Sequence, residues 1–152
     1  MRLIRRVTST GSACLSVTHP SQTVMSTHVE TGKEGEQLAS EHLIENGYQV
    51  MATNYRFQRS EVDIVAFEPA KRYADGGEMV FVEVKTRRGE GFGRPEEAVT
   101  DEKKRHLIRA AKAWLHENKM DRTPARFDVL AIDLRKGKPP EFHHIKNAFW
   151  TF

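Results

Sequence analysis

The segments Glu61-Val62-Asp63-Ile64-Val65 and Val80-Phe81-Val82-Glu83-Val84-Lys85 decide the fold of this chain. Both are short, rich in Val and Ile, and polar at every second position, which is typical of β-strands. Side chains alternate between the two faces of a strand, so Glu61 and Asp63 share one face of the first strand. Glu83 and Lys85 likewise share one face of the second. The opposite, apolar face carries Val62, Ile64, Val82 and Val84.

The charged face is also largely apolar, so we expect both faces of these strands to be covered. Its apolar members are Val65, Phe67, Met79 and Phe81. Acids with a lysine on a covered face are costly unless they bind one another or a cation. Two interpretations follow. Asp63 and Glu83 could hold one Mg²⁺ that keeps several waters, with Lys85 orienting such a water or balancing a phosphate. Alternatively, the acids and the lysine form a structural network across the strands.

The spacing of these residues resembles that of the PD-(D/E)XK nuclease superfamily. Asp63 is followed after nineteen residues by Glu83-Val84-Lys85, which matches the acid and the E-x-K element, while Val62 stands where the superfamily name has Pro. By itself this match is of low specificity, because the residue types are abundant and the gap is variable.

Further motifs in the same order resemble the YraN-type family of small bacterial proteins, which is assigned to that superfamily. The resemblance extends from about Gly32 to Leu134, with one departure at Ser60, where the family usually has Gly. The additional motifs are Gly35-Glu36-x-x-Ala39, Gly47-Tyr48, Asn54-Tyr55-Arg56, Thr86-Arg87, Glu97-Ala98-Val99-Thr100 and Arg126-Phe127-Asp128-Val129.

The resemblance implies an active site and a cofactor. Asp63 and Glu83 would be ligands of Mg²⁺ or Mn²⁺, Glu36 would complete the site through a water or a second ion, and Lys85 would place the nucleophile. From spacing alone, Glu36 is as well explained as a solvent-facing helix residue. Glu61 is either a further metal ligand or a partner of Lys85.

The predicted fold class is α/β, an α+β mixed sheet with the restriction-endonuclease-like order α-β-β-β-α-β. A Thr31-x-x-Glu34 capping box opens the first helix, which Gly47 ends. Thr100 caps the second helix, which runs to about Asn118. We expect strands at 48–57, 61–67, 79–85 and 126–134, with residues 68–78 joining the second and third as an antiparallel hairpin. A last strand at 141–145 is less clearly indicated.

Composition bounds the class of protein. The 152 residues suffice for one domain, the single Cys14 excludes a disulfide framework, and no apolar run approaches the roughly 20 residues of a membrane helix. The histidines show no zinc-like spacing with a second ligand class. The net charge of +3 lies entirely in residues 1–29. A nucleic-acid surface must therefore come from local clusters. The candidates, each of which could equally be a solvated charge, are Arg56, Arg59, Arg87, Arg88, Lys103 and Lys104.

Residues 1–30 differ from the rest of the chain and are expected to form a disordered extension to a domain at 31–152. A transit peptide is compatible with their Arg and Ser content, a secretory signal is not, and a start at Met25 is the favoured interpretation.

The resulting functional hypothesis is a metal-dependent nuclease that hydrolyses DNA phosphodiester bonds, with branched or processed DNA as a candidate substrate form. The alternative is a non-catalytic nucleic-acid-binding or assembly protein that retains the fold. We expect a cytoplasmic protein whose partner is nucleic acid rather than a membrane, with a homodimer left open.

Overall fold

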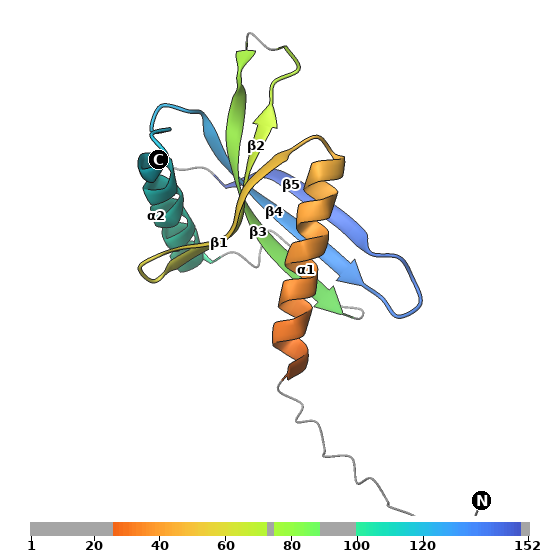
Figure 1. The fold of residues 1–152 in the computed structure, drawn as a ribbon. Helices are drawn as coiled ribbons and strands as arrows, with labels where there is room; N and C mark the ends of the chain where they lie inside the picture. The colour runs from red at the N-terminus through yellow and green to blue at the C-terminus, as the bar shows by residue number, and fades with distance from the viewer. Residues whose placement is uncertain (1–25, 73–74, 89–99, 150–152) are drawn as a thin grey trace, which may run out of the picture.

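The computed structural model describes residues 26–72, 75–88 and 100–149 (Figure 1). The expectations for residues 1–25, and the Glu97-Ala98-Val99 part of the motif that ends at Thr100, fall outside the described residues. In chain order the elements are α1 (Ser26–Glu45), β1 (Gln49–Phe57), β2 (Ser60–Pro69), β3 (Gly77–Arg88), α2 (Asp101–Glu117), β4 (Ala125–Leu134) and β5 (Glu141–Phe149). The predicted α-β-β-β-α-β order is confirmed, and β5 is the suggested last strand.

The five strands form one mixed sheet in the order β1-β2-β3-β4-β5. Neighbouring strands are antiparallel except β3 and β4, which are parallel and are joined through α2. A parallel pair requires a long crossover, and α2 supplies it. The predicted antiparallel hairpin of β2 and β3 is confirmed by the pairing of Ile64 with Val82. The fold is therefore the expected α+β sheet flanked by helices.

Two apolar clusters cover the two faces of the sheet, one under each helix (Figure 1). Ala39 and Leu43 of α1 pack with a cluster that includes Ile64, Val82 and Leu130. Leu107, Ala111 and Trp114 of α2 pack with a cluster that includes Val65, Phe81 and Val129. Both faces of the central strands are thus covered, as their apolar residues predict. Across the described residues, no helix is long and apolar enough to cross a membrane.

The start of α1 differs from the prediction. The helix begins at Ser26 rather than after Thr31, so residues 26–30 are helical instead of belonging to the extension. No Pro or Gly separates Ser26 from the Thr31 box, so nothing forces the chain out of the helix there. The other end agrees: Gly47 has a φ of +87° and ends the helix as predicted.

The ends of α2 follow the sequence prediction closely. Thr100 is the N-cap, and its hydroxyl accepts a hydrogen bond from Lys103 N at 3.3 Å. Asp101 and Glu102 place negative charge in the first turn, which favours the helix dipole. The helix ends at Glu117. This fixes Lys103 and His106 one turn apart on the side of α2 that faces the sheet.

The face assigned to Val62 was wrong. Val62 packs in the α2-side cluster, whereas Ile64 belongs to the α1-side cluster. The cause is a fork between strands: the β2–β3 pairs end at Ile64 with Val82, while β2 continues to pair with β1 as far as Ser60. A register shift in β1 between Val50 and Ala52 adds to the twist of this hairpin. The fork opens where the acidic residues lie.

Candidate functional site

Asp63 occupies the fork between β2 and β3. Its Oδ2 accepts a hydrogen bond from Val84 N at 2.7 Å, so a side chain satisfies a main-chain donor that the diverging strand no longer reaches. This contact holds the carboxylate between the strands and directs it toward Glu83. The two acids that the sequence placed on one face therefore do lie together, on neighbouring strands.

The environment of Asp63 disfavours its negative charge. Burial, and then the charge of Glu83, raise the pKa of Asp63 to about 7. The hydrogen bond from Val84 opposes this rise without cancelling it. When two carboxylates lie close together without enough positive charge nearby, the pKa of one of them rises. A bound cation would lower that pKa again. The direction of this pKa shift is the one expected for two acids that repel each other.

Lys103 of α2, rather than Lys85, is the cation at this acid pair. Its ammonium forms an ion pair with Glu83, whose side chain is only 5% exposed. Partial burial lowers the pKa of Lys103, but the hydrogen bond and charge of Glu83, together with Asp63, leave it raised. Sequence reasoning placed Lys103 with the nucleic-acid contacts. Lys103 lies three residues after the Thr100 N-cap, in the first turn of α2. This position is the sequence signal that could have indicated a place near the sheet.

Glu36 reaches the site because α1 approaches β3 very closely. A Cβ added to Gly35 would lie 1.8 Å from Thr86 Oγ1, so only glycine fits there without a shift. The next residue, Glu36, lines a cavity with Asp63 and Glu83, and its Oε2 accepts a hydrogen bond from Asn54 at 2.7 Å. The Gly35-Glu36 dipeptide of the sequence motif thus has a structural reason.

Lys85 and Glu61 lie on opposite sides of the acid pair. Lys85 is half-buried and lines the cavity that contains Glu36. Glu61 lines a different cavity and pairs with Arg56 at 3.1 Å. Within the described part of the chain, Lys85 forms an ion pair with neither Glu61 nor Asp63. Of the two roles left open for Glu61, the partnership with Lys85 is therefore not the one found among the described residues.

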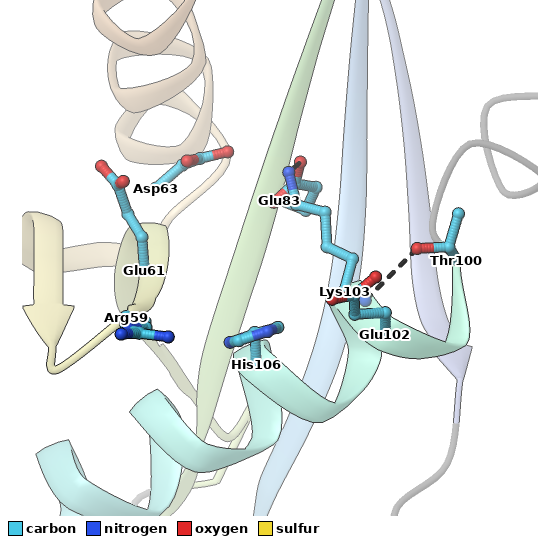
Figure 2. A pocket seen from close by; sticks show the side chains of 8 residues that line it. All are labelled: Arg59, Glu61, Asp63, Glu83, Thr100, Glu102, Lys103 and His106. Atoms are coloured by element: carbon cyan, nitrogen blue, oxygen red, sulfur yellow. Dashed lines mark hydrogen bonds and ion pairs between the residues drawn. The ribbon is translucent and has the colours of Figure 1, made fainter.

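Two cavities meet at the acid pair. The first, of about 300 Å³, is lined by Arg59, Glu61, Asp63, Glu83, Thr100, Glu102, Lys103 and His106 (Figure 2). The second, of about 290 Å³, is lined by Gly32, Glu36, Asp63, Glu83, Val84, Lys85, Thr86 and Lys103. Three residues, Asp63, Glu83 and Lys103, belong to both. Figure 2 shows Glu61 and Asp63 on one side of the first cavity, with Arg59 and His106 toward one end.

Ser60, the departure from the family pattern, has a defined contact. It is 2% exposed, and its Oγ lies 3.1 Å from His106 Nδ1. The positive φ needed for the tight β1–β2 turn falls on Gln58, at +56°, and not on Ser60. The local turn therefore tolerates serine, and His106 joins the site as a residue that sequence reasoning did not identify.

The donor set at the fork fits a hard divalent cation. Mg²⁺ is usually bound through one or two carboxylates plus waters, and Asp63 with Glu83 supplies that pair. Asp63, Glu83 and Glu36 do not approach one another as a tight trio. Among the described residues, the trio whose ligand atoms all lie within 4.8 Å of one another is Asp133, Glu141 and His143. That trio lies on β4 and β5 and brings His143 near two acids in space, a proximity that the sequence spacing does not indicate.

The six predicted nucleic-acid residues are in different situations. Arg56 pairs with Glu61, and Arg88 pairs with Glu34 at 2.6 Å. Arg59 is exposed and lines the first cavity. Lys103 belongs to the acid pair, and Lys104 pairs with Asp101 at 3.2 Å. Arg87 is half-buried in β3. These residues flank the site without forming one patch.

A third cavity of about 620 Å³ is more basic than the other two. It lies between the middle of α1, the end of β3 and the β4–β5 connection. Its lining contains Glu34, Leu38, Arg88, Leu134, Arg135, Lys136, Lys138 and Pro140. Four of these residues are cationic and one is anionic, so this end of the sheet favours anions.

The Arg126-Phe127-Asp128 motif builds a separate buried network. Asp128 accepts hydrogen bonds from Arg126 Nε at 3.0 Å, from His144 Nε2 at 2.9 Å and from Asn147 N at 3.0 Å. Burial raises the pKa of Asp128, but the His144 and Arg126 hydrogen bonds bring it below its ordinary value. The guanidinium of Arg126 is also paired with Glu78. The charged groups of this motif have their partners within the protein, so the motif stabilises the fold.

Comparison with known proteins agrees with these motifs. Residues 35–132 match the sequence model of a family described as "Uncharacterised protein family UPF0102". A UPF0102 protein of Pelobacter propionicus is 42% identical over 130 residues, covering 86% of this chain and 89% of that protein. A UPF0102 protein of Rhodococcus opacus is 41% identical over 125 residues, covering 82% of this chain and all of that protein.

The matched span begins at Gly35 and includes Glu36, Asp63 and Glu83, the helix α2 that carries Lys103, and β4 as far as Ile132. Similarity at this level over most of the chain is sufficient for membership. The chain therefore belongs to UPF0102, the YraN family, a PD-(D/E)XK-like group.

Proposed function

We propose that this protein is a metal-dependent phosphodiesterase that acts on DNA. The observation that carries the proposal is the pair formed by Asp63 and Glu83 at the β2–β3 fork. Both acids line two cavities, and burial, followed by the charge of Glu83, raises the pKa of Asp63 to about 7. A strongly perturbed acid in a cleft is a feature of functional sites more often than of surfaces.

The residues divide into roles. Asp63 and Glu83 would hold the divalent cation, which when bound lowers the pKa of a water and stabilises charge on the phosphate. Glu36, held by Asn54, would bind a water at the edge of the site. Lys85 lies on the same side as Glu36 and would orient the attacking water. Lys103 neutralises Glu83 in the metal-free protein and would be released toward the phosphate when a cation takes its place.

Basic residues on both sides of the fork support a nucleic-acid substrate. Arg59 lies at the first cavity, and the basic third cavity lies beyond the end of β3 that carries Arg88. Phosphate contacts from Arg and Lys supply most sequence-independent affinity for DNA. The net charge outside residues 1–29 is zero, so the affinity of the domain for DNA must come from these local clusters.

The alternative function is a non-catalytic nucleic-acid-binding or assembly protein. The Lys103–Glu83 ion pair favours it, because a buried acid with its own lysine can be purely structural. The raised pKa of Asp63 is the observation against it, since Lys103 leaves that carboxylate without full compensation. A structural network would be expected to satisfy both acids.

The test compares the parent protein with Asp63→Asn and Glu83→Gln on single-stranded, nicked and branched DNA, with RNA as a further substrate. Exposed Asp121 lies beyond α2 and pairs with His116, so Asp121→Asn is the matched loss of one acid outside the site. We expect cleavage only with Mg²⁺ or Mn²⁺, a loss of about 100-fold or more in both site variants, and unchanged cleavage in the control.

Calorimetric titration with Mn²⁺ provides a second readout, in which both site variants should bind more weakly than the parent. A parent protein that binds DNA but cleaves none of these substrates with either metal would refute the nuclease proposal and favour the alternative.

A further inference from the structure

The two cavities at the acid pair differ in what they offer a phosphodiester. The second holds Lys85 and Glu36, and the first holds Arg59 and His106. Because Asp63, Glu83 and Lys103 line both, a phosphorus atom held at the acid pair would have one cavity on either side. The chain of a nucleic acid would then continue from one cavity into the other.

The chemistry of phosphoryl transfer assigns a direction to this arrangement. The attacking and leaving oxygens lie roughly in line on opposite sides of the phosphorus. If Lys85 orients the attacking water in the second cavity, the leaving oxygen must face the first cavity. The residues of the first cavity are therefore the ones available to stabilise the leaving group.

His106 is the residue in the first cavity whose chemistry suits a leaving oxygen. It lies on α2, three residues after Lys103, and is half-buried. Its Nδ1 lies 3.1 Å from the hydroxyl of buried Ser60 on β2, which fixes the ring between the helix and the strand. In a protonated imidazole both nitrogens are donors, so Nδ1 can donate to Ser60 while Nε2 is left for a ligand.

We propose that the first cavity is the leaving-group side of the site and that His106 is the general acid of the reaction. Water attacks the phosphorus, the bond from phosphorus to the leaving oxygen breaks, and its electron pair stays on that oxygen. The oxygen takes the Nε2 proton of His106, and the proton of the attacking water passes to bulk solvent. This inference rests on the proposed phosphodiesterase function and adds a residue and a polarity to it.

Charged groups from β2, β3, α2 and the β1–β2 turn line the cavity that contains His106 (Figure 2). The cations among them favour a bound phosphate. The charged groups are Arg59, Glu61, Asp63, Glu83, Glu102 and Lys103. A simpler role also exists, in which the Ser60–His106 contact only ties β2 to α2. The two roles differ in how the rate depends on the leaving group.

The experiment uses oligonucleotides with one scissile bond, in matched pairs with oxygen or sulfur as the bridging leaving atom. Because the cleavage polarity is open, one pair places sulfur at the 3′ side and another at the 5′ side. A thiolate leaves without protonation. We therefore expect His106→Asn and His106→Gln to lose about 100-fold in rate on the oxygen substrate, a typical general-acid contribution, and much less on one sulfur substrate.

Ser60→Ala should show a smaller loss with the same preference for sulfur, because the ring is still present but less well held. Equal losses on oxygen and sulfur substrates in both His106 variants, or no loss at all, would overturn the general-acid role while leaving the nuclease proposal intact. A parent protein that cleaves no oxygen substrate with Mg²⁺ or Mn²⁺ would overturn both.

Discussion

Gly35→Ala tests the close approach of α1 to β3 that places Glu36 at the site. The added methyl group would lie 1.8 Å from Thr86 Oγ1 and 3.0 Å from Thr86 Cβ, whereas ordinary contacts begin at 3.4 Å. Rotating the Thr86 side chain removes the first clash but not the second. The helix must therefore move away from the strand, and its neighbour Glu36 must move with it.

The magnitude follows from two opposing effects. Overpacking a tight site costs about 1–3 kcal/mol. Replacing glycine by alanine inside a helix contributes about 0.5–1 kcal/mol in the opposite direction. We expect a net loss of about 1–2 kcal/mol for Gly35→Ala, or about 2–8 °C in Tm for a domain of this size.

Gly32 provides the matched control on the same helix, because nothing lies within 4 Å of a Cβ added there. Gly32→Ala should raise the free energy of unfolding by about 0.5–1 kcal/mol. In a double-mutant cycle, Thr86→Ala should reduce the cost of Gly35→Ala by about 1 kcal/mol, because it removes the clashing hydroxyl. Thermal and urea unfolding measure these differences. A Gly35→Ala protein as stable as Gly32→Ala, or one whose cost is independent of Thr86, would refute the argument.

Three further substitutions test the charges. In EDTA, Asp63→Asn should match the parent in stability only near pH 4 and should be increasingly more stable than the parent up to pH 8. The raised pKa of Asp63 means that between about pH 4 and pH 7 the native state keeps a proton that the unfolded chain has lost, so the parent loses stability across this range. Lys103→Met should lose about 1–3 kcal/mol in EDTA, because buried Glu83 is left unpaired, and should recover in Mg²⁺. Asp128→Asn should lose about 1–3 kcal/mol with or without metal, because the buried guanidinium of Arg126 loses one of its charged partners and keeps Glu78.

Metal and pH distinguish these three outcomes. Asp121→Asn, an exposed acid paired with His116, should change stability by no more than about 0.5 kcal/mol in either condition. A large drop for Asp63→Asn in EDTA at pH 8 would mean that Asp63 is a structural acid. A Lys103→Met protein that Mg²⁺ fails to stabilise would show that Lys103 does not occupy the place of a cation.

Most of the fold was predictable because local and global patterns agree in this sequence. Alternation marked β2 and β3, and the Thr100 cap with the apolar spacing around Trp114 marked α2. The start of α1 was not predictable from the sequence. The Thr31-x-x-Glu34 capping box indicates a helix start there, whereas in the structure these residues lie inside a helix that begins at Ser26. A capping motif specifies an N-terminus only when the preceding residues leave the helix, and residues 26–30 contain nothing that makes them leave.

The site was predictable up to the point at which strands stop being regular. Asp63, Glu83 and Lys85 follow from alternation and spacing. Their partners do not, because the fork between β2 and β3 changes which groups meet. Lys103 and His106 come from a helix far along the chain, and only tertiary packing shows that they face the acids. Val62 was assigned to the wrong face for the same reason.

The two buried polar clusters of this protein argue for different roles. In the Arg126–Asp128 cluster each charged group has partners, and the pKa of Asp128 lies below its ordinary value despite burial. At the fork the opposite holds. Lys103 forms an ion pair with Glu83, whereas burial and repulsion from Glu83 raise the pKa of Asp63. Folding alone would favour replacing such an acid with a neutral residue. A buried acid that weakens the metal-free fold is explained when a cation completes it, which is why the fork and not the satisfied cluster is the place to look for chemistry.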